Sequence, residues 1–456
     1  MQLLIVSLFF SFVQADMSAA ESYIKKLKSN KSYSIQIKNL QTNELVNWQA
    51  EKKMTPASLT KLAILSALKE HYPWDWKFKS YLFGKSAVKG SVLEGGICFK
   101  ASGDPSLVSE KMWVLVNNLT RKNIKKIRGG VYIDTSIHND AKKDAGRSQS
   151  KSARAYNAPI SAASFNWNSV NIYVQPTTMN KKAKVYLDPK SDYFVLTNKI
   201  KTVKGRVKNL KHGIHQSRTF KDGKEYLTLS GKIGIENEEE LIFRNVSHPV
   251  KWFGHNLIAF MKQRGIEVEG EIQEKSCADH KTLLSEIESK DLYLIYRDMM
   301  KYSNNFITEL LVKSMLTTKG ETGSIAKAKE VIEKHLHSLG IKEFQLESVS
   351  GLSYQNRFSA NDMNLILKDL IKDPNSIELL STLPLAGLDG TLKSRFEFLG
   401  DNESFRAKTG LLSNAVALSG VYDQEKTRYL ISMIYNGKSI YRARQEMQEI
   451  VKRLRK

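Results

Sequence analysis

The chain has 456 residues, of which 41% are hydrophobic and 26% are charged. This mixture is typical of a globular protein of roughly two or three domains and excludes a disordered or collagen-like chain. The net charge of +23 favours an anionic partner such as a nucleic acid, a membrane surface or an acidic polymer.

The positive charge is concentrated in one segment. Lys181 to Lys232 holds 14 Lys and Arg against 4 Asp and Glu, a net charge of +10. Since no zinc-finger spacing, ribonucleoprotein aromatics or basic zipper accompanies it, we expect no nucleic-acid partner. We interpret the segment as a solvated basic face that is available for peripheral contact with an anionic wall or membrane.

The N-terminus carries a short apolar run, Leu3 to Val13, which is too short to cross a bilayer. It is followed by small Ala15, so residues 1–15 are predicted to be a secretory signal peptide, although no Lys or Arg precedes the run. The alternative is an N-terminal core helix. No later segment approaches 18 uninterrupted apolar residues, so we expect a soluble mature chain.

Further elements follow from periodicity and turn residues. Residues Ser32 to Ile37 and Leu45 to Trp48 predict a hairpin, and Thr55-Pro56-Ala57 opens a buried helix that includes Ser58 in its first turn. From about residue 77 to 275, short strand-like runs broken by Gly, Asn and Asp indicate inserted β-rich material. The later predictions are helices at 292–300, 306–315 and 325–339, strands at 406–413, 415–422 and 427–435, and a closing amphipathic helix at 446–456.

The chain has two cysteines, Cys98 and Cys277. A disulfide between them is possible, but nothing in the sequence shows that they are close. The histidine pairs lack a third ligand, and there is no H-E-x-x-H, complete P-loop or G-x-S-x-G elbow. We therefore expect neither a metal nor another cofactor.

The first motif that carries chemistry is Ser58-Leu59-Thr60-Lys61. Serine and lysine three residues apart share one face of a helix. A neutral lysine amine can take the proton of the serine hydroxyl, which makes a nucleophile without histidine.

Two further motifs follow in the chain. Ser303-Asn304-Asn305 stands between two predicted helices, where helix capping is the commoner use of such residues. Lys408-Thr409-Gly410 lies in a predicted strand, where it offers a cation, a hydroxyl and a close-approach backbone to a substrate carboxylate; an edge strand protected by lysine is the alternative. In this order the three motifs match the S-x-x-K, S-x-N and K-T-G set of β-lactamases and penicillin-binding proteins.

The chain resembles the class C low-molecular-mass penicillin-binding proteins, the D-alanyl-D-alanine carboxypeptidases and endopeptidases of the bacterial periplasm. Ser58 and Ser303 lie 245 positions apart, which is similar to this family and far longer than in class A β-lactamases. Further segments that look like the family's are Ala101–Leu107, Val131–Ile137, Tyr156–Pro159, Ser350–Ser353 and Leu383–Leu392.

The resemblance implies an α/β fold: a transpeptidase-like domain, with a five-stranded antiparallel sheet flanked by helices, from residues 17–76 and 276–456. Residues 77–275 would form two inserted, mainly β domains. It also implies a periplasmic serine DD-peptidase that acts on peptidoglycan stem peptides and is acylated by β-lactams. Two departures are Asn304, where the family usually has Asp, and Leu411, where Ser or Thr is common after K-T-G.

The residue roles are likewise those that the resemblance implies. Ser58 is the nucleophile, Lys61 its base, and Ser303 the proton relay to the leaving amine. Asn305 binds the acyl peptide, Lys408 and Thr409 hold the terminal carboxylate, and the strand backbone at Gly410 and Leu411 contacts the substrate. The N–H groups of Ser58 and Leu411 form the oxyanion hole.

Two alternatives remain open, a catalytically silent peptidoglycan-binding protein and a β-lactamase. A finer expectation concerns Gly146 to Asn157, which contains no carboxylate although some relatives place an aspartate there. We expect Lys151, with Arg154 close by, to weaken selectivity for a free amine on the third residue of the stem peptide. A mobile loop with solvated charges is the alternative.

Overall fold

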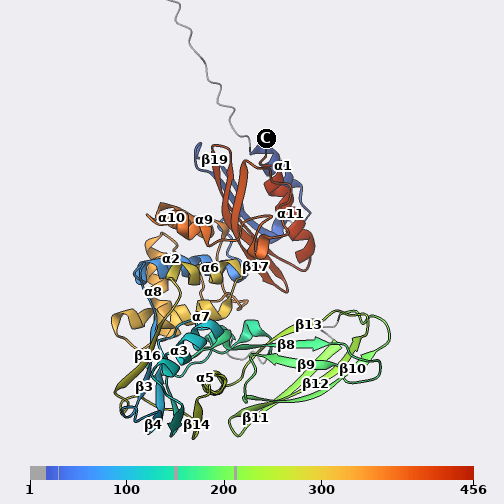
Figure 1. The fold of residues 1–456 in the computed structure, drawn as a ribbon. Helices are drawn as coiled ribbons and strands as arrows, with labels where there is room; N and C mark the ends of the chain where they lie inside the picture. Colours follow the sequence, from blue (N-terminus) through green and yellow to red (C-terminus); the bar gives the residue numbers. More distant parts are fainter. Residues whose placement is uncertain (1–16, 29, 148–151, 210–212, 456) are drawn as a thin grey trace, which may run out of the picture. The chain divides into compact units, whose positions relative to one another are not determined.

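The structure is a computed structural model that describes residues 17–28, 30–147, 152–209 and 213–455 (Figure 1). The predicted signal peptide and Lys151 lie outside the described residues. The chain forms two compact units. The first comprises Met1–Leu59, Glu343–Gln345 and Tyr354–Lys456, and the second comprises Thr60–Lys342 and Leu346–Ser353. Within the described ranges, no helix is long and apolar enough to cross a membrane.

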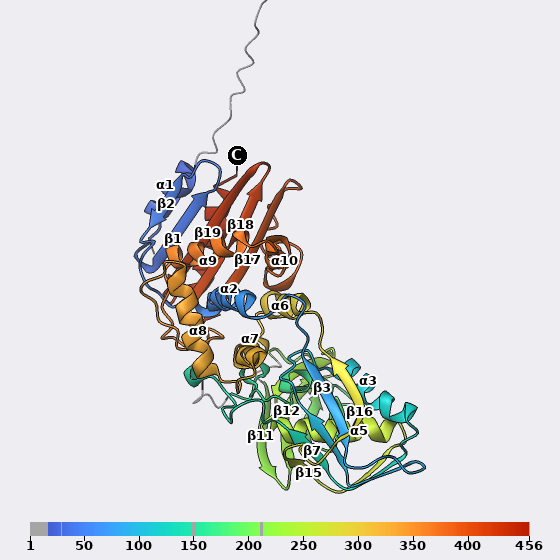
Figure 2. The ribbon, with the colours of Figure 1, turned by 90° about the vertical axis from the view of Figure 1, so that its left-hand side faces the viewer.

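The first unit is built on a five-stranded antiparallel sheet, which confirms the predicted fold class. Side chains alternate across the sheet. Ile35 and Ile37 face one helical layer, whereas Gln36 Oε1 accepts a hydrogen bond from Asn364 Nδ2 of the other. The two helical layers lie on opposite faces of the sheet (Figures 1 and 2). The strands, in sheet order, are β17 (Glu403–Leu412), β18 (Ala415–Gln424), β19 (Thr427–Asn436), β1 (Tyr33–Asn39) and β2 (Leu45–Trp48). The layers are α1 (Ser18–Lys26) with α11 (Ile440–Lys452), and α9 (Ala360–Lys372) with α10 (Ser376–Ser381).

The closing helix was predicted too late in the chain. Helix α11 begins at Ile440 and ends at Lys452, not at 446 and 456. Its buried stripe starts with Ala443, one turn before Met447, so the apolar face extends further toward the N-terminus than the large side chains indicate.

The second unit contains the helices that carry two of the three motifs. Helix α7 (Asn305–Ser314) is buried along its whole length and contacts α2 (Thr60–His71), α6 (Leu292–Lys301) and α8 (Ile325–Ser338). The predicted start of the second helix was wrong. A 3₁₀ turn, η2 (Ala57–Leu59), precedes α2, because Ala57 has a φ of +50°, outside the right-handed helical region.

The rest of the second unit is mainly β, with two long helices, α3 (Ser109–Arg121) and α5 (Pro249–Gln263). The domain boundaries predicted from the sequence stay a prediction, because the two compact units group the chain in another way and do not test them. One sheet has the order β15 (Ile272–Glu274), β7 (Val131–Asp134), β5 (Ile97–Lys100), β3 (Lys79–Gly84), β16 (Thr282–Glu288). The others are β14 (Glu267–Glu269), β6 (Lys126–Arg128), β4 (Val92–Glu94); β10 (Phe194–Val203), β12 (Lys224–Gly234), β11 (Ile214–Lys221); and β13 (Glu240–Asn245), β8 (Ser169–Gln175), β9 (Lys184–Asp188).

Cys98 and Cys277 form a disulfide, with their Cα atoms 5.5 Å apart and 179 positions between them in the sequence. The sequence did not favour this pairing. The sheet order explains it, because β5 carries Cys98, and β7 joins β5 to β15, the strand that runs out toward Cys277.

Candidate active site

In the first unit, the turn η2 presents Ser58 beside strand β17. Gly410 of β17 lies so close to this turn that a Cβ atom on it would stand 2.6 Å from the Pro56 carbonyl oxygen and 3.2 Å from the Ser58 nitrogen. The glycine of K-T-G is therefore required for the close approach of strand and turn. Ser58 of the S-x-x-K motif and the strand β17, which carries the K-T-G motif, thus belong to the same unit.

The other K-T-G side chains have defined environments on β17. Lys408 is fully buried, and its Nζ atom donates to the Thr409 carbonyl oxygen at 2.9 Å. The Thr409 hydroxyl donates to the Thr391 hydroxyl at 2.8 Å, and Leu411 is 54% exposed. Thr391 belongs to the 383–392 segment that the sequence singled out without giving it a role.

In the second unit, Lys61 is the second residue of α2 and is fully buried. Its Nζ atom donates to Asn305 Oδ1 at 2.7 Å and to the Ser350 carbonyl oxygen at 2.5 Å. Burial lowers the pKa of Lys61 to about 7, while the charge of Glu309 raises this pKa and that of Arg147 lowers it. A large share of the amine is therefore neutral near pH 7.

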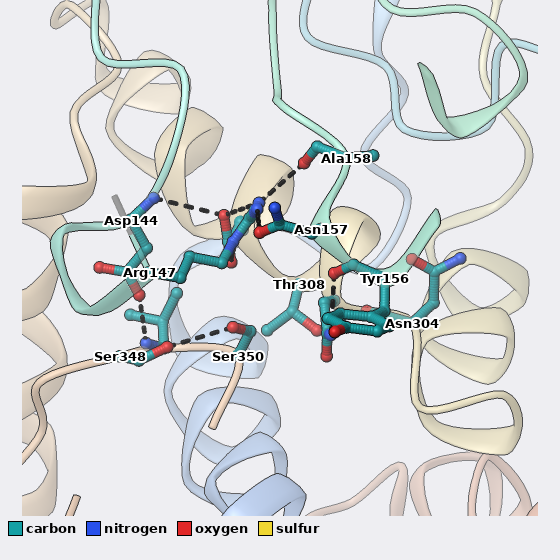
Figure 3. A network of polar contacts seen from close by, with 12 residues as sticks. Asp144, Arg147, Tyr156, Asn157, Ala158, Asn304, Thr308, Ser348 and Ser350 are labelled. Carbon is teal, nitrogen blue, oxygen red and sulfur yellow. Dashed lines mark hydrogen bonds and ion pairs between the residues drawn. The ribbon is translucent and has the colours of Figure 1, made fainter. Parts of the chain in front are cut away.

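The two charges that act on Lys61 form a buried ion pair (Figure 3). Arg147 donates from Nε to Glu309 Oε1 at 2.5 Å and from Nη2 to Glu309 Oε2 at 2.6 Å. The same guanidinium reaches Asn157 Oδ1 at 3.0 Å and the Ala158 carbonyl oxygen at 2.8 Å. Both members of the pair act on the charge of the Lys61 amine, in opposite directions, after the larger effect of burial.

The loop whose Ser350 carbonyl oxygen accepts the hydrogen bond from Lys61 is itself held in place (Figure 3). The Val349 backbone N–H donates to Asp144 Oδ2 at 2.7 Å, and the Ser348 and Ser350 hydroxyls lie 3.1 Å apart. Burial and, to a smaller extent, the charge of Glu309 raise the pKa of Asp144 to about 6. Asp144 therefore anchors the segment whose Ser350 carbonyl receives Lys61.

The second motif lies between α6 and α7. Ser303 has a φ of +53°, an unusual conformation for a residue with a side chain. Asn304 caps α7, since its side-chain oxygen accepts from the Ile307 N–H at 3.1 Å. The Asn305 amide accepts from Lys61, and its Nδ2 donates to the Tyr156 carbonyl oxygen at 3.1 Å. Ser303 and Asn305 line a cavity of about 590 Å³.

The predicted residues therefore fall into two groups. Ser58, Lys408, Thr409, Gly410 and Leu411 belong to the first unit, and Lys61, Ser303 and Asn305 to the second. Along the chain, the crossing between the units falls between Leu59 and Thr60, so Ser58 and Lys61 are still only three residues apart.

Sequence reasoning did not give roles to Ser350, Tyr156, Arg147 or Glu309. A signal existed for Glu309, which follows Asn305 by four residues and so shares its helix face. Lys151 lies outside the described residues, so its predicted effect on selectivity stays a prediction. Arg154 is exposed. No group of three or more His, Cys, Asp or Glu suited to a metal occurs in the part of the chain that the structure describes.

Comparisons with known proteins agree with this architecture. The family model of the D-Ala-D-Ala carboxypeptidase 3 (S13) family matches residues 17–456. The D-alanyl-D-alanine carboxypeptidase DacB of Haemophilus influenzae is 21% identical over 416 residues, 87% of this chain and 83% of the relative. A D-alanyl-D-alanine carboxypeptidase of Actinomadura sp. is 25% identical over 87% of this chain and 76% of its own length.

Solved structures share the fold. The crystal structure of penicillin binding protein 4 (dacB) from H. influenzae, also solved in complex with a β-lactam, has a TM-score of 0.79 at 21% identity. It covers 96% of this chain and 98% of the H. influenzae chain. A predatory endopeptidase of Bdellovibrio bacteriovorus has a TM-score of 0.53 at 14% identity and covers 92% of both chains. On the match over residues 17–456, this chain belongs to the D-Ala-D-Ala carboxypeptidase 3 (S13) family.

Proposed function

We propose that this protein is a periplasmic serine DD-peptidase. It hydrolyses D-Ala-D-Ala termini, and D-Ala-diaminopimelate cross-links, of peptidoglycan through an acyl-enzyme on Ser58. The observation that carries this proposal is the buried Lys61 amine, whose pKa is lowered to about 7 and which is aimed by Asn305 and Ser350. Membership of the S13 family supports the substrate class.

The acylation step uses residues of all three motifs. Ser58 Oγ attacks the carbonyl carbon of the penultimate D-Ala, and neutral Lys61 accepts the hydroxyl proton. The backbone N–H groups of Ser58 and Leu411 stabilise the negative oxygen that forms. Ser303 relays a proton to the departing amine, so the peptide bond breaks and the leaving amino acid is neutralised. Water then hydrolyses the ester on Ser58.

The remaining residues orient the substrate. Lys408 and Thr409 hold the terminal carboxylate, and the peptide lies along β17 at Gly410. Asn305 binds the backbone of the acyl peptide. An asparagine amide has two N–H donors, and one of them serves Tyr156, so the second is available to a substrate carbonyl.

The disulfide supports the proposed compartment. Disulfides persist in oxidising compartments such as the bacterial periplasm and are rare in the cytosol. The Cys98–Cys277 pair therefore fits an exported chain. A β-lactam, which resembles the D-Ala-D-Ala terminus, would acylate Ser58 in the same way as the substrate.

The test follows a fluorescent penicillin on the purified chain. We expect a long-lived adduct on Ser58, release of D-Ala from a pentapeptide that ends in D-Ala-D-Ala, and loss of both in a folded Ser58→Ala variant. Rapid turnover of the penicillin would indicate a β-lactamase, and no adduct a silent binding protein. Continued D-Ala release by Ser58→Ala would show that the assigned nucleophile is wrong.

A further inference from the structure

The cavity that contains Ser303 and Asn305 continues away from the catalytic motif. Its far wall is formed by Trp167 and by three residues of neighbouring strands, Asn171, Asp188 and Phe243. These three are adjacent in register, since Asn171 of β8 lies between Phe243 of β13 and Asp188 of β9. The cavity therefore borders one face of the sheet β13-β8-β9. The strands of this sheet are labelled in Figure 1.

That sheet face carries aromatic rings further along the same strands. The burial of β8 alternates, with Val170, Ile172 and Val174 in the core, so Tyr173 lies on the same face as Asn171. Tyr173 pairs with Tyr186 of β9, and the two rings stack with centroids 4.5 Å apart and planes at 4°. We name Tyr156, Trp167, Phe243, Tyr173 and Tyr186 the aromatic track.

Four of the five rings of the aromatic track are exposed. Tyr156 is 48%, Trp167 40%, Phe243 51% and Tyr186 44% exposed. A contiguous group of exposed aromatic side chains marks a binding surface more often than scattered single residues do.

Trp167 is presented by a strained and tightly fastened turn. Asn166, Trp167 and Asn168 have φ values of 47°, 53° and 50°. Asparagine accepts this left-handed conformation, but a bulky tryptophan in it is an outlier of the kind that clusters at ligand-binding sites.

Both flanking amides hold the turn. Asn166 bonds with the Ser109 N–H and hydroxyl at 3.0 and 3.1 Å. Asn168 accepts from the Phe165 N–H at 3.1 Å and donates to the Pro159 carbonyl oxygen at 2.9 Å. The turn is thereby fixed with the Trp167 ring toward the cavity, which is a preorganised platform rather than a loose loop.

The chemistry of the track suits an uncharged, hydroxyl-rich polymer. Rings supply apolar faces, and Ser169 and Asn171 supply hydrogen-bonding groups between them. Among its strand residues that face the same way, Lys184 and Asp188 carry one charge of each sign, although the whole chain has a net charge of +23. A ligand recognised mainly through charge would not select this face.

We propose that the aromatic track binds the glycan strand of peptidoglycan, with its N-acetylated sugars against the rings, while the attached stem peptide enters at Ser303 and Asn305. The choice of polymer rests on the proposed function. It follows from the shared cavity, because Tyr156, Trp167 and Phe243 of the track line the same cavity as Ser303 and Asn305, so one molecule can reach both. The inserted part of the chain is then a substrate-recognition surface.

The test measures binding of peptide-free glycan strands, and of an N-acetylglucosamine tetramer, to the Ser58→Ala chain by calorimetry. We expect Trp167→Ala and Phe243→Ser to weaken glycan binding at least tenfold. Tyr226→Ala is the matched control, since Tyr226 is a 41% exposed ring on β12 of the neighbouring sheet, and it is expected to bind glycan like its parent. Thermal unfolding shows that each variant is folded.

Three outcomes overturn the proposal: no glycan binding, equal binding by the Trp167 and Phe243 variants and their parent, or displacement of the glycan by a sugar-free stem pentapeptide. Displacement by the pentapeptide would show that the aromatic track binds the stem peptide rather than the glycan. Failure of the proposed function is distinguishable, because it appears as the absence of a penicillin adduct on the Ser58 chain, whereas glycan binding is measured without Ser58.

Discussion

Lys61 can act as a base only in the fraction of molecules in which its amine is neutral. In water a lysine has a pKa near 10.4, so less than one molecule in 10³ would qualify at pH 7. Burial against Asn305 and Ser350 lowers the pKa to about 7 and raises that fraction to about one half. On the proposed mechanism, the burial of this one side chain therefore makes the base available near pH 7.

The pH dependence of acylation should report this amine. The rate of penicillin acylation is expected to rise through an inflection near pH 7 as Lys61 loses its proton, and to level off above it. Because the Glu309 carboxylate raises the pKa of Lys61, Glu309→Gln should move the inflection to lower pH. Stopped-flow measurement from pH 5 to 9 checks both, with Glu330→Gln on the exposed side of α8 as control. A rate independent of pH over this range would contradict the role of Lys61.

At the scale of the element, the approach of β17 to the turn η2 sets the position of Ser58. The approach depends on the absence of a side chain at Gly410, where a Cβ atom would lie 2.6 Å from the Pro56 oxygen. Contacts below 3 Å force a shift, and here the opposing atoms are backbone. The close approach of the strand and the turn thus contributes to the position of Ser58.

Gly410→Ala should reduce penicillin acylation about 10²-fold, because a misplacement of about 1 Å at a reacting group costs about that much. Gly400→Ala is the matched control, since a Cβ atom there meets nothing closer than 3.5 Å. Second-order acylation rates of both variants measure the effect, and circular dichroism shows that both are folded. Equal rates for the two alanine variants would show that the close approach is not needed.

The disulfide between Cys98 and Cys277 ties strand β5 to the segment after β15 across 179 residues. Closing so long a loop restricts the unfolded chain, and loss of a native disulfide commonly costs about 2–5 kcal/mol. We expect the double variant Cys98→Ala, Cys277→Ala to unfold at a lower urea concentration, while Ser58 still forms the penicillin adduct in the absence of urea. Cys98→Ser, Cys277→Ser is a second variant with nearly the original volume. An unchanged urea midpoint in both would contradict the expectation.

The sequence was most informative where a pattern is local. Alternation predicted the hairpin and the three terminal strands, and the motifs placed Ser303 between two helices. It was least informative where the cause is distant in the chain: the acceptor of Lys61 at Ser350 and the Arg147–Glu309 pair exist only after folding. The helix start near Ser58 was wrong because no propensity rule anticipates a left-handed Ala57.

At the scale of the whole molecule, the second unit has one sheet with several basic residues and another with the aromatic track. Of the 14 Lys and Arg in the basic segment 181–232, six lie on the strands of the sheet β10-β12-β11 and one on β9, whereas β13-β8-β9 carries most of the aromatic track. Two sheets of one unit thus present different chemistry, one suited to anionic polymers and one to neutral sugars. The positive charge of the chain is therefore distributed unevenly, with a net charge of +10 in residues 181–232.

Three lysines form a row across the basic sheet. Lys201 of β10 lies opposite Lys232 of β12 and opposite Lys182, and all three side chains are exposed. No ion pair to any of them is present among the described residues. Like charges placed opposite each other across a sheet destabilise it, so an anionic partner that neutralises the row would relieve a cost that the free protein bears.

We expect this row to contribute to association with cell-wall sacculi that carry anionic polymers. Each lysine near an anionic surface contributes about 1 kcal/mol, so replacing all three by Gln should weaken association at least tenfold at about 0.01 M salt. The difference should vanish at about 1 M salt, where charges are screened beyond about 3 Å. The control replaces Lys79, Lys126 and Lys262, which are already paired with carboxylates, by Gln. Co-sedimentation with sacculi measures both triple variants, and because they remove the same net charge, an equal loss of binding would assign the effect to net charge and not to the row.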